Sequence, residues 1–399
     1  RLFLFSIGGF TFVVFKTYKM NDMKGKQGMV CMGLLLVLSS CHTGKQITAS
    51  GLQRKDFQTE VNGQHTDLFT LSNKQGMEVC ITNYGARVVS ILVPDRNGKR
   101  EDVVCGFSTI TEYMEQRQNF GSTVGRYIGR ILNARFTLDG VEYKLVPNNG
   151  KSGHISHGGN PGFADRIWKV EQADTHRVCL SYLSPDGENG FPGNLKVTLV
   201  YSLGEDDNAL DLTYEATTDA PTVLNLSHHS FFNISGNFTK SVEDQQLWVD
   251  ADRFTPYDDK KCVTGEYLQV AGTPLDFRMP HAIGECIDAD HPQLKVVNGY
   301  DHTWELNTKG DDTRPAAWVY DPASGRKMEI FTTEPGMQIY TGNGLKGKMT
   351  GKGRIAYPFR SAVCFETMHF QDSPNQPGFP STVLRPGEVF RSHTVYKFE

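Results

Sequence analysis

The sequence predicts an all-β fold, a large antiparallel β-sandwich, and three observations support this prediction. Segments in which apolar and polar residues alternate recur along the chain, as expected for strands with one buried face. Turn signals separate these segments, and the 399-residue chain contains 40 Gly and 18 Pro. Only Thr109 to Gln118 has the periodicity of a helix, and this segment is short. Many short strands in a chain of this length favour a sandwich, and the lack of a fixed repeat argues against a propeller.

The predicted strands follow one another between clear turns. Val79 to Val93 reads as one or two strands around Asn83-Tyr84-Gly85. Later alternating segments lie at Leu195 to Leu203, Ala209 to Thr217, Lys327 to Thr333 and Met337 to Thr341. The turn signals are Asp95-Arg96-Asn97-Gly98, Asp139-Gly140, Pro147-Asn148-Asn149-Gly150, Asp206-Asp207-Asn208 and Pro322-Ala323-Ser324-Gly325. Gly, Asn, Asp and Pro at these places favour reversals of the chain.

Residues 1–40 read as an upstream extension followed by a targeting segment. Lys24 and Lys26 form a small basic region, and Met29 to Leu38 is apolar but too short to span a bilayer as a helix. The next residues, Leu38-Ser39-Ser40-Cys41, resemble the lipobox of bacterial lipoproteins. The resemblance implies cleavage before Cys41 and a lipid on its thiol. An ordinary signal peptide with an incidental cysteine, or a buried hydrophobic strand, is the alternative.

The first 19 residues begin with Arg1 and are largely apolar. Translation extended upstream of a start at Met20 or Met23 accounts for them, and a second membrane segment is the alternative. With the lipobox, these features predict an exported lipoprotein, anchored through Cys41 and facing the periplasm of a Gram-negative bacterium.

The rest of the chain divides into a short tether and one domain. Residues 41–64 are expected to carry the fold away from the anchor, and residues 65–399 to form the sandwich. Six cysteines lie beyond the anchor and none forms a C-x-x-C pair, which argues against a zinc ribbon or a thioredoxin-like site. Export permits disulfides, but six cysteines allow 15 pairings, and buried free thiols are equally compatible with the sequence.

Charge and composition exclude some partners. The net charge is −4, and Lys and Arg form no basic stripe, so nucleic acid is not an expected partner. His154 and His157 have a spacing that is compatible with a metal ion, but no third ligand clusters with them in the sequence. A concave sheet with polar and aromatic side chains would suit a sugar, which offers hydroxyls for hydrogen bonds and C–H faces for aromatic packing.

His229 is the first candidate for chemistry. It lies in the apolar run Asn225-Leu226-Ser227-His228-His229-Ser230-Phe231-Phe232-Asn233, so it is expected to be buried. Imidazole exchanges protons near neutral pH. A core histidine satisfied by Asn225 or Asn233 is the alternative. His228 and His229 cannot both ligate one ion from a strand, because neighbouring side chains point to opposite faces.

Glu366 is the second candidate. It follows Val363, Cys364 and Phe365, an apolar setting in which an isolated carboxylate is costly and binds its proton more tightly. Such a residue needs either a partner or a function. A buried ion pair with Arg360 or Arg354 is the alternative.

Three further residues could hold a ligand. Arg130 can donate a fork of hydrogen bonds to paired hydroxyls, and the glycines around it do not form a phosphate loop, since no Lys-Ser/Thr follows. Asp276, within Gly272 to Arg278, could accept hydrogen bonds from sugar hydroxyls, and Gln338 lies on an alternating segment. A surface arginine, a turn aspartate and an exposed strand residue are the alternatives.

Together, these segments resemble the aldose 1-epimerases, or galactose mutarotases, from roughly Gly51 to Glu399. The matching blocks occur in the order of the family and include Asn83-Tyr84-Gly85-Ala86, Gly129-Arg130-Ile131, His157-Gly158-Gly159, Asp186 to Gly193, Asn225 to Ile234, Thr273 to Arg278, Gly299-Tyr300-Asp301-His302, Pro335 to Asn343, Cys364-Phe365-Glu366-Thr367, Asn375 to Pro380 and Leu384 to Glu388. Each block alone is a weak signal, whereas their shared order is a strong one.

The resemblance implies a β-supersandwich that interconverts the α and β anomers of free hexoses. It assigns the general acid to His229 and the general base to Glu366, and it assigns sugar binding to Arg130, His157, Asp276 and Gln338. It implies no metal and no organic cofactor, and a free monosaccharide as the substrate.

The sequence departs from the family pattern near the proposed pocket. Gly129 stands where the family usually has Asn, Thr303 where Asn is common, and Met368 where Gln is common; the family's Asn-His-Ser-Tyr-Phe reads His228-His229-Ser230-Phe231-Phe232 here. The proposed acid and base are intact, so these changes bear on sugar preference. A lyase or glycosidase on a related sandwich, a hexose-phosphate epimerase and a non-catalytic sugar-binding lipoprotein are the alternative functions.

Overall fold

The computed structural model describes residues 2–7, 10–15 and 46–399. In the first part, β1 (Leu2–Ile7) pairs with β2 (Phe10–Phe15) in an antiparallel hairpin. Residues 46–399 belong to a separate compact unit. The predicted targeting segment and Cys41 lie outside the described residues. None of the helices in the described part is long and apolar enough to cross a membrane.

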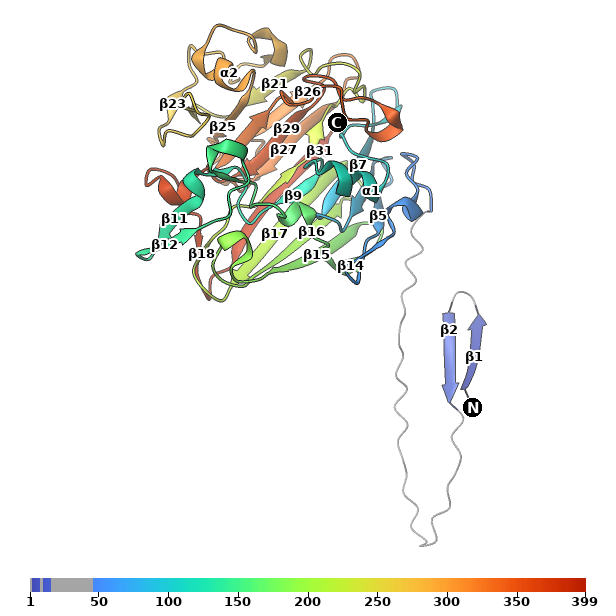
Figure 1. The fold of residues 1–399 in the computed structure, drawn as a ribbon. Coiled ribbons are helices and arrows are strands. Elements are labelled where there is room, and N and C mark those ends of the chain that lie inside the picture. Colours follow the sequence, from blue (N-terminus) through green and yellow to red (C-terminus); the bar gives the residue numbers. More distant parts are fainter. Residues whose placement is uncertain (1, 8–9, 16–45) are drawn as a thin grey trace. The chain divides into compact units, whose positions relative to one another are not determined.

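A nine-stranded antiparallel sheet forms the larger layer of the compact unit (Figure 1). Alternation of apolar side chains explains its strands. In β16 (Leu195–Leu203) every second residue is buried, from Leu195 to Leu203, and the residues between them are partly or fully exposed. In spatial order the sheet contains β14 (Lys169–Ala173), β15 (Arg177–Ser184), β16, β17 (Ala209–Thr218), β31 (Phe390–Phe398), β27 (Lys327–Thr332), β26 (Ala317–Tyr320), β21 (Gln246–Val249) and β24 (His281–Ala282).

A six-stranded antiparallel sheet packs against the first. Its order is β20 (Phe231–Phe232), β29 (Val363–Met368), β28 (Gly336–Tyr340), β25 (Asp301–Glu305), β22 (Arg253–Thr255) and β23 (Leu268–Gln269). Every residue of β29 is buried. Tyr396 of β31 donates a hydrogen bond to the Phe365 carbonyl of β29 (3.0 Å), which joins the two layers through their shared core.

A four-stranded sheet completes the main framework, with the order β5 (Leu68–Ser72), β6 (Glu78–Thr82), β7 (Arg87–Pro94) and β8 (Arg100–Asp102). The prediction of an all-β fold built from antiparallel strands is therefore confirmed. The turn at residues 83–85 divides β6 from β7, as the sequence indicated. The predicted helix is α1 (Ile110–Gln116), and the Thr109 side chain caps it.

A second helix, α2 (Pro292–Val297), was missed by the sequence analysis. It has only six residues, so its apolar positions establish no periodicity. His291 at the N-cap and Pro292 in the first turn are the local signals that could have found it.

The segment predicted as a tether is described from residue 46, and this part packs against the domain. Phe57 is fully buried and Leu52 nearly so, and the two belong to one apolar cluster with Tyr113. The compact fold therefore begins before residue 65. Two apolar anchors within a polar segment were too few to predict this packing. The six cysteines of residues 46–399 are free thiols, which settles the question that their spacing left open.

Two small strand pairs carry side chains to one edge of the six-stranded sheet. β19 (Ser227–His229) pairs with β9 (Ser122–Val124), with His229 opposite Ser122. β10 (Arg130–Ile131) pairs with β13 (Ile155–Ser156), with Arg130 opposite Ser156. The site described next lies where these pairs meet β28 and β29.

Candidate active site

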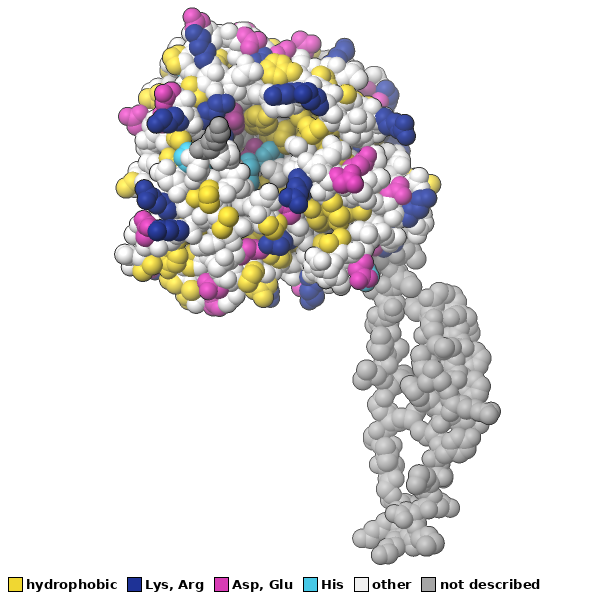
Figure 2. All heavy atoms as spheres, viewed as in Figure 1, with side chains coloured by type: hydrophobic (Ala, Val, Ile, Leu, Met, Phe, Trp, Pro, Cys, Tyr) yellow, Lys and Arg dark blue, Asp and Glu magenta, His cyan; other side chains and the backbone are white. Residues whose placement is uncertain are grey.

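A cavity of about 260 Å³ lies among these strands. Figure 2 shows histidine side chains within a hollow on the face of the molecule seen there. Segments from across the chain contribute to the wall, which consists of Gln118, Asn119, Gly129, Arg130, Ser156, His157, His229, Phe231, Asp301, Gln338, Tyr340, Glu366, Met368 and Gln371. Five of the six residues that the sequence analysis assigned to catalysis or sugar binding are therefore brought together.

His229 and Glu366 lie side by side in the wall. The distance between His229 Nε2 and Glu366 Oε1 is 3.4 Å, and both side chains are buried. The ring of His229 stacks on Phe231, with 5.1 Å between the centroids. Arg360, considered as a partner of Glu366, instead pairs with Glu243 and Asp288. The alternative of a structural ion pair between Glu366 and Arg360 is thereby excluded.

The alternation of β19 explains why His229, and not His228, reaches the cavity. His228 points to the other face, where its Nε2 lies 2.6 Å from Ser230 Oγ and its ring meets Tyr201 and Tyr396. The side chains of Asn225 and Asn233 bond elsewhere, Asn225 with the backbone of His369 and Asn233 with the Ser361 carbonyl. The alternative of a core histidine satisfied by these asparagines does not hold for His229.

Burial shifts both members of the pair toward their uncharged forms. Loss of solvent raises the pKa of Glu366 well above 4.5, and the nearby Asp301 carboxylate adds to this effect while Arg130 opposes it. Loss of solvent also lowers the pKa of His229 well below 6.5, and the neighbouring His157 contributes. Burial therefore favours one proton on the pair, carried by the carboxyl group.

The ring of His157 faces that of His229, and one of its nitrogens has no hydrogen-bond partner. The two rings meet edge to face, with 5.5 Å between their centroids. His157 Nδ1 is buried without a hydrogen-bond partner, although buried polar atoms are nearly always paired in folded proteins. Burial lowers the pKa of His157 to about 4, with a smaller effect from Arg130, so its ring is neutral. The ring of His154 contacts Asn133 and Cys262 instead, so the two histidines considered for a metal ion do not converge.

Gln338 is held by hydrogen bonds across neighbouring strands. In the pairing of β28 with β25 and β29, it lies opposite Thr303 on one side and Glu366 on the other. Its Oε1 accepts a hydrogen bond from Thr303 Oγ1, and its Nε2 donates to Asp301 Oδ1 (2.7 Å). Arg130 reaches the same part of the wall and is half-buried, next to Asp301 and Tyr257.

Asp276 is not in the cavity, so the structure corrects its predicted place. Its carboxylate binds Arg278 in a fork, with Arg278 Nε 2.9 Å from Oδ1 and Nη2 2.8 Å from Oδ2. The two residues are neighbours but one in the sequence, and Arg278 is also paired with Asp252. The aspartate that does line the cavity is Asp301, whose pKa burial raises above 3.8, against the opposing effect of Arg130.

Sequence reasoning missed several residues of the wall. Asp301 stands in a matched block, Gly299-Tyr300-Asp301-His302, and this signal could have identified it. Tyr340 likewise stands in the matched block Pro335 to Asn343, whereas Gln371 and Gln118 had no such signal. Three residues that depart from the family pattern, Gly129, Phe231 and Met368, line the cavity directly, and a fourth, Thr303, hydrogen-bonds Gln338. These changes therefore alter the wall itself.

Within residues 46–399, one set of side chains could hold a metal ion: His229, Cys364 and Glu366, whose candidate ligand atoms lie within 4.8 Å of one another. Cys364 Sγ lies 3.7 Å from Nδ1 of His229, whereas Glu366 Oε1 lies 3.4 Å from Nε2. The two ring nitrogens point in different directions, so an ion on one nitrogen faces only one of the two partners. The arrangement fits proton exchange better than chelation, and the absence of a metal requirement stays a prediction.

Comparison with known proteins agrees with this geometry. A family model described as aldose 1-epimerase matches residues 67–397. Galactose mutarotase from Bos taurus is 40% identical over 331 residues, which cover 83% of this chain and 93% of that protein. Aldose 1-epimerase from Escherichia coli (strain K12) is 36% identical over 339 residues, 84% and 96% of the two chains.

Solved structures give the same result. An aldose epimerase homologue from C. elegans aligns with a TM-score of 0.77 and 30% identity over 84% of this chain and 99% of that one. Galactose 1-epimerase from Lactobacillus acidophilus aligns with a TM-score of 0.74 and 28% identity over 86% and 96%. The predicted galactose mutarotase-like fold is therefore confirmed, and the chain belongs to the aldose 1-epimerase family.

Proposed function

We propose that this protein interconverts the α and β anomers of free hexoses, with Glu366 as general base and His229 as general acid. One observation carries the assignment of roles: an imidazole and a carboxyl group, both buried, lie 3.4 Å apart in the wall of the cavity. Family membership supports the reaction, since the matched relatives are named galactose mutarotase and aldose 1-epimerase.

The proposed reaction opens and closes the sugar ring. Glu366 takes the proton of the C1 hydroxyl while protonated His229 gives a proton to the ring oxygen, O5. The C1–O5 bond breaks and leaves an aldehyde at C1. Rotation about C1–C2 presents the other carbonyl face, O5 attacks it, and both proton transfers reverse. No atom is gained or lost, and no hydride or covalent intermediate is needed.

One shared proton is enough for the whole cycle. Ring opening leaves the proton on Glu366 and a neutral His229, which is the state that burial favours. Before ring opening, this proton moves from the carboxyl group to the imidazole, and their separation of 3.4 Å shortens to hydrogen-bond distance for the transfer. Closure then returns both groups to their starting states.

The remaining wall residues suit the binding of one sugar ring. Arg130 presents guanidinium N–H groups and Asp301 a carboxylate to paired hydroxyls, and the unpartnered Nδ1 of His157 offers a further contact. Tyr340 and Phe231 supply aromatic surface. The cavity of about 260 Å³ is smaller than the ~300–1,000 Å³ typical of drug-sized ligands, which favours a monosaccharide over an oligosaccharide.

The test is exchange between anomers of free sugars. We expect the purified protein to accelerate exchange between the anomeric proton NMR signals of D-galactose or D-glucose, and to speed the decay of optical rotation of the fresh α anomer. Release of reducing ends from an oligosaccharide would indicate a hydrolase, and an unsaturated product absorbing in the ultraviolet would indicate a lyase. Sugar binding without faster exchange would contradict the proposal and favour a binding protein.

We also infer that the protein is exported and anchored by a lipid on Cys41. The order of the basic residues Lys24 and Lys26, the apolar segment and Leu38-Ser39-Ser40-Cys41 supports this proposal. Mass spectrometry of the mature protein should find an N-terminal Cys41 carrying lipid, and Cys41→Ser should abolish incorporation of labelled fatty acid. A mature protein that begins elsewhere, or that carries no lipid, would contradict it.

A further inference from the structure

Gln371 lies in the cavity wall, although nothing in the sequence assigned a role to it. It follows β29 by three residues, and its side chain is almost completely buried. The hydrogen bonds of its amide group join parts of the wall that come from distant segments of the chain.

Each side of this amide binds a different part of the wall. Oε1 accepts hydrogen bonds from the backbone N–H of Arg130 (3.3 Å) and from Arg130 Nη1 (3.5 Å). Nε2 donates to Tyr257 OH (2.6 Å) and to Gln338 Oε1 (3.3 Å). An amide has two acceptor sites and two N–H donors, so these contacts use its full capacity. Gln371 has nothing left for a sugar hydroxyl and acts on the sugar through its neighbours.

Gln338 continues the same chain of hydrogen bonds. Its Oε1 accepts from Thr303 and Gln371, so its NH₂ group faces Asp301, to which it donates at 2.7 Å. The sequence of contacts is therefore Arg130, Gln371, Gln338 and Asp301. Its two ends are the charged groups proposed to hold the sugar, and the two amides between them fix their relative orientation.

Residue 129 must lack a side chain for Gln371 to reach this place. Gly129 has φ of +75°, and a Cβ atom there would lie 2.5 Å from Gln371 Cγ and 3.0 Å from Cδ. Cγ is in the middle of the side chain, and both sides of the amide beyond it are bound, so it cannot move away without breaking the contacts with Arg130 and Gln338.

We propose that Gln371 is a positioning residue of the sugar site, which holds Arg130 and Asp301 in register through Gln338 and depends on glycine at position 129. This inference rests on the proposed sugar chemistry but makes a separate claim about two residues with no assigned role. Because the amides orient binding groups and do not touch the reacting atoms, their loss should affect KM more than kcat.

The test is a double-mutant cycle on the full-length protein, measured with the sugar that the wild type turns over. Gln371→Ala should raise KM about tenfold, as expected for loss of hydrogen bonds to a charged group, with kcat changed less than about threefold. Gly129→Ala should raise KM at least as much, because the new Cβ displaces Gln371. In the Gln371→Ala background, Gly129→Ala should add little to KM, since Cγ is gone; the backbone strain of an alanine at φ +75° is present in both backgrounds and cancels in the comparison. Gln269→Ala, on the exposed strand β23, is the control and should leave both parameters unchanged.

Three results would overturn the inference while the wild type remains active: an unchanged KM in Gln371→Ala, equal fall of kcat and kcat/KM in that variant, or the same factor from Gly129→Ala in both backgrounds. If Gly129→Ala alone fails to fold, the double variant decides. A folded double variant supports the steric dependence, and an unfolded one contradicts it, because the backbone at position 129 would then be the cause. An inactive wild type would instead defeat the proposed function.

Discussion

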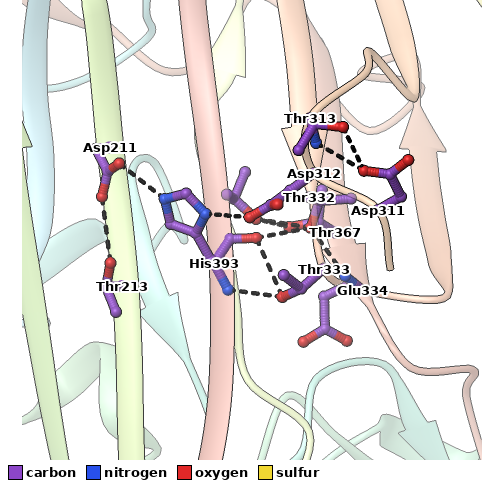
Figure 3. Close-up of polar contacts among 11 residues, drawn as sticks. Asp211, Thr213, Asp311, Asp312, Thr313, Thr332, Thr333, Glu334, Thr367 and His393 are labelled. Atoms are coloured by element: carbon purple, nitrogen blue, oxygen red, sulfur yellow. Dashed lines mark hydrogen bonds and ion pairs between the residues drawn. The ribbon is translucent and has the colours of Figure 1, made fainter. Parts of the chain in front are cut away.

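Two imidazole–carboxyl groups in this molecule behave in opposite ways. His229 and Glu366 are buried and 3.4 Å apart. His393 of β31 lies between Asp211 and Asp312, with Nε2 2.7 Å from Asp211 Oδ2 and Nδ1 2.6 Å from Asp312 Oδ2 (Figure 3). About 30% of the His393 side chain is exposed, compared with 7% for His229. The same two functional groups thus meet in two different environments.

The environment determines the charge. Hydrogen bonds that the His393 ring donates to the carboxylates of Asp211 and Asp312 raise its pKa to about 9 against the effect of partial burial, so His393 is a cation at neutral pH. His229 has no such short, water-accessible contacts, and burial lowers its pKa well below 6.5. Short contacts to two carboxylates make a fixed ion pair that stabilises structure, whereas a longer contact between two buried side chains leaves a proton free to move.

The alternation of side chains along β31 points His393 away from the sheet that carries Glu366. Thr394 and Tyr396 of β31 point inward and contact Thr367 and the Phe365 carbonyl of β29. His393 points to the opposite face, where Asp312, from the loop between β25 and β26, approaches it (Figure 3). The difference teaches that proximity of His to Asp or Glu does not by itself mark an active site.

The largest expected effect comes from breaking the buried pair. His229→Asn and Glu366→Gln should each lower kcat by about 10²–10⁴, the range for loss of one positioned proton-transfer group, with little change in the far-ultraviolet circular dichroism. His393→Asn is the matched control and should retain kcat within about twofold, because its partners are structural. Near-normal turnover of either cavity variant, in the NMR or polarimetric assay, would remove the assignment of acid and base.

A smaller effect, on KM, should distinguish Asp301 from Asp276, one of which lines the cavity while the other is held in an ion pair. Asp301 lines the cavity, whereas Asp276 is fixed by Arg278 as His393 is fixed by its carboxylates. Asp301→Ala should raise KM at least about tenfold, since it removes a charged hydrogen-bond acceptor for the sugar. Asp276→Ala should leave KM unchanged. Initial-rate measurements over a range of sugar concentrations would decide, and the reverse ranking would restore the role first expected for Asp276.

These aspartates also show how far sequence alone could lead. Local patterns were sufficient for β16, whose predicted and observed bounds coincide, because the alternation of apolar and polar residues can be read from neighbouring positions. Family blocks were sufficient to predict that His229 and Glu366 converge. The choice between Asp276 and Asp301 depends on pairing of β25 with β28, where Asp301 lies opposite Tyr340, and on the short contact of Asp276 with Arg278.

Gln371 was beyond sequence reasoning for a different reason. Its place depends on the lack of a Cβ atom at Gly129, which lies 242 positions earlier in the chain. No pattern of neighbouring residues expresses such a steric relation. The His393 group is similar, since Asp211, Asp312 and His393 meet only after β17, β31 and the loop before β26 have assembled.

A still smaller effect is expected from breaking the exposed group. The pKa of His393 is raised in the folded state, from 6.5 to about 9, so its contribution to stability is complete below pH 6.5 and is lost as pH rises through about 9. His393→Asn should therefore lower the free energy of unfolding by about 1–2 kcal/mol at pH 6, after allowance for solvent screening. Urea unfolding of both proteins from about pH 6 to 10 would measure this difference. A difference that is constant over this range would show that charge on His393 does not contribute.

The smallest expected effect is a near absence of pH dependence where an ordinary histidine would titrate. Because burial lowers the pKa of His229 well below 6.5, the one-proton state of its pair with Glu366 should persist as the pH falls past that value. Between pH 6.5 and 5.5, kcat/KM should therefore change less than about twofold, whereas an essential imidazole of ordinary pKa that must stay neutral would lose several-fold. His393→Asn should not alter this profile, because the exposed group makes no contact with the cavity wall. A fall of kcat/KM at acid pH, centred near pH 6.5, would mean that His229 is hydrated in the working enzyme. The contrast between a buried and a partly exposed imidazole–carboxyl group would then no longer explain their roles.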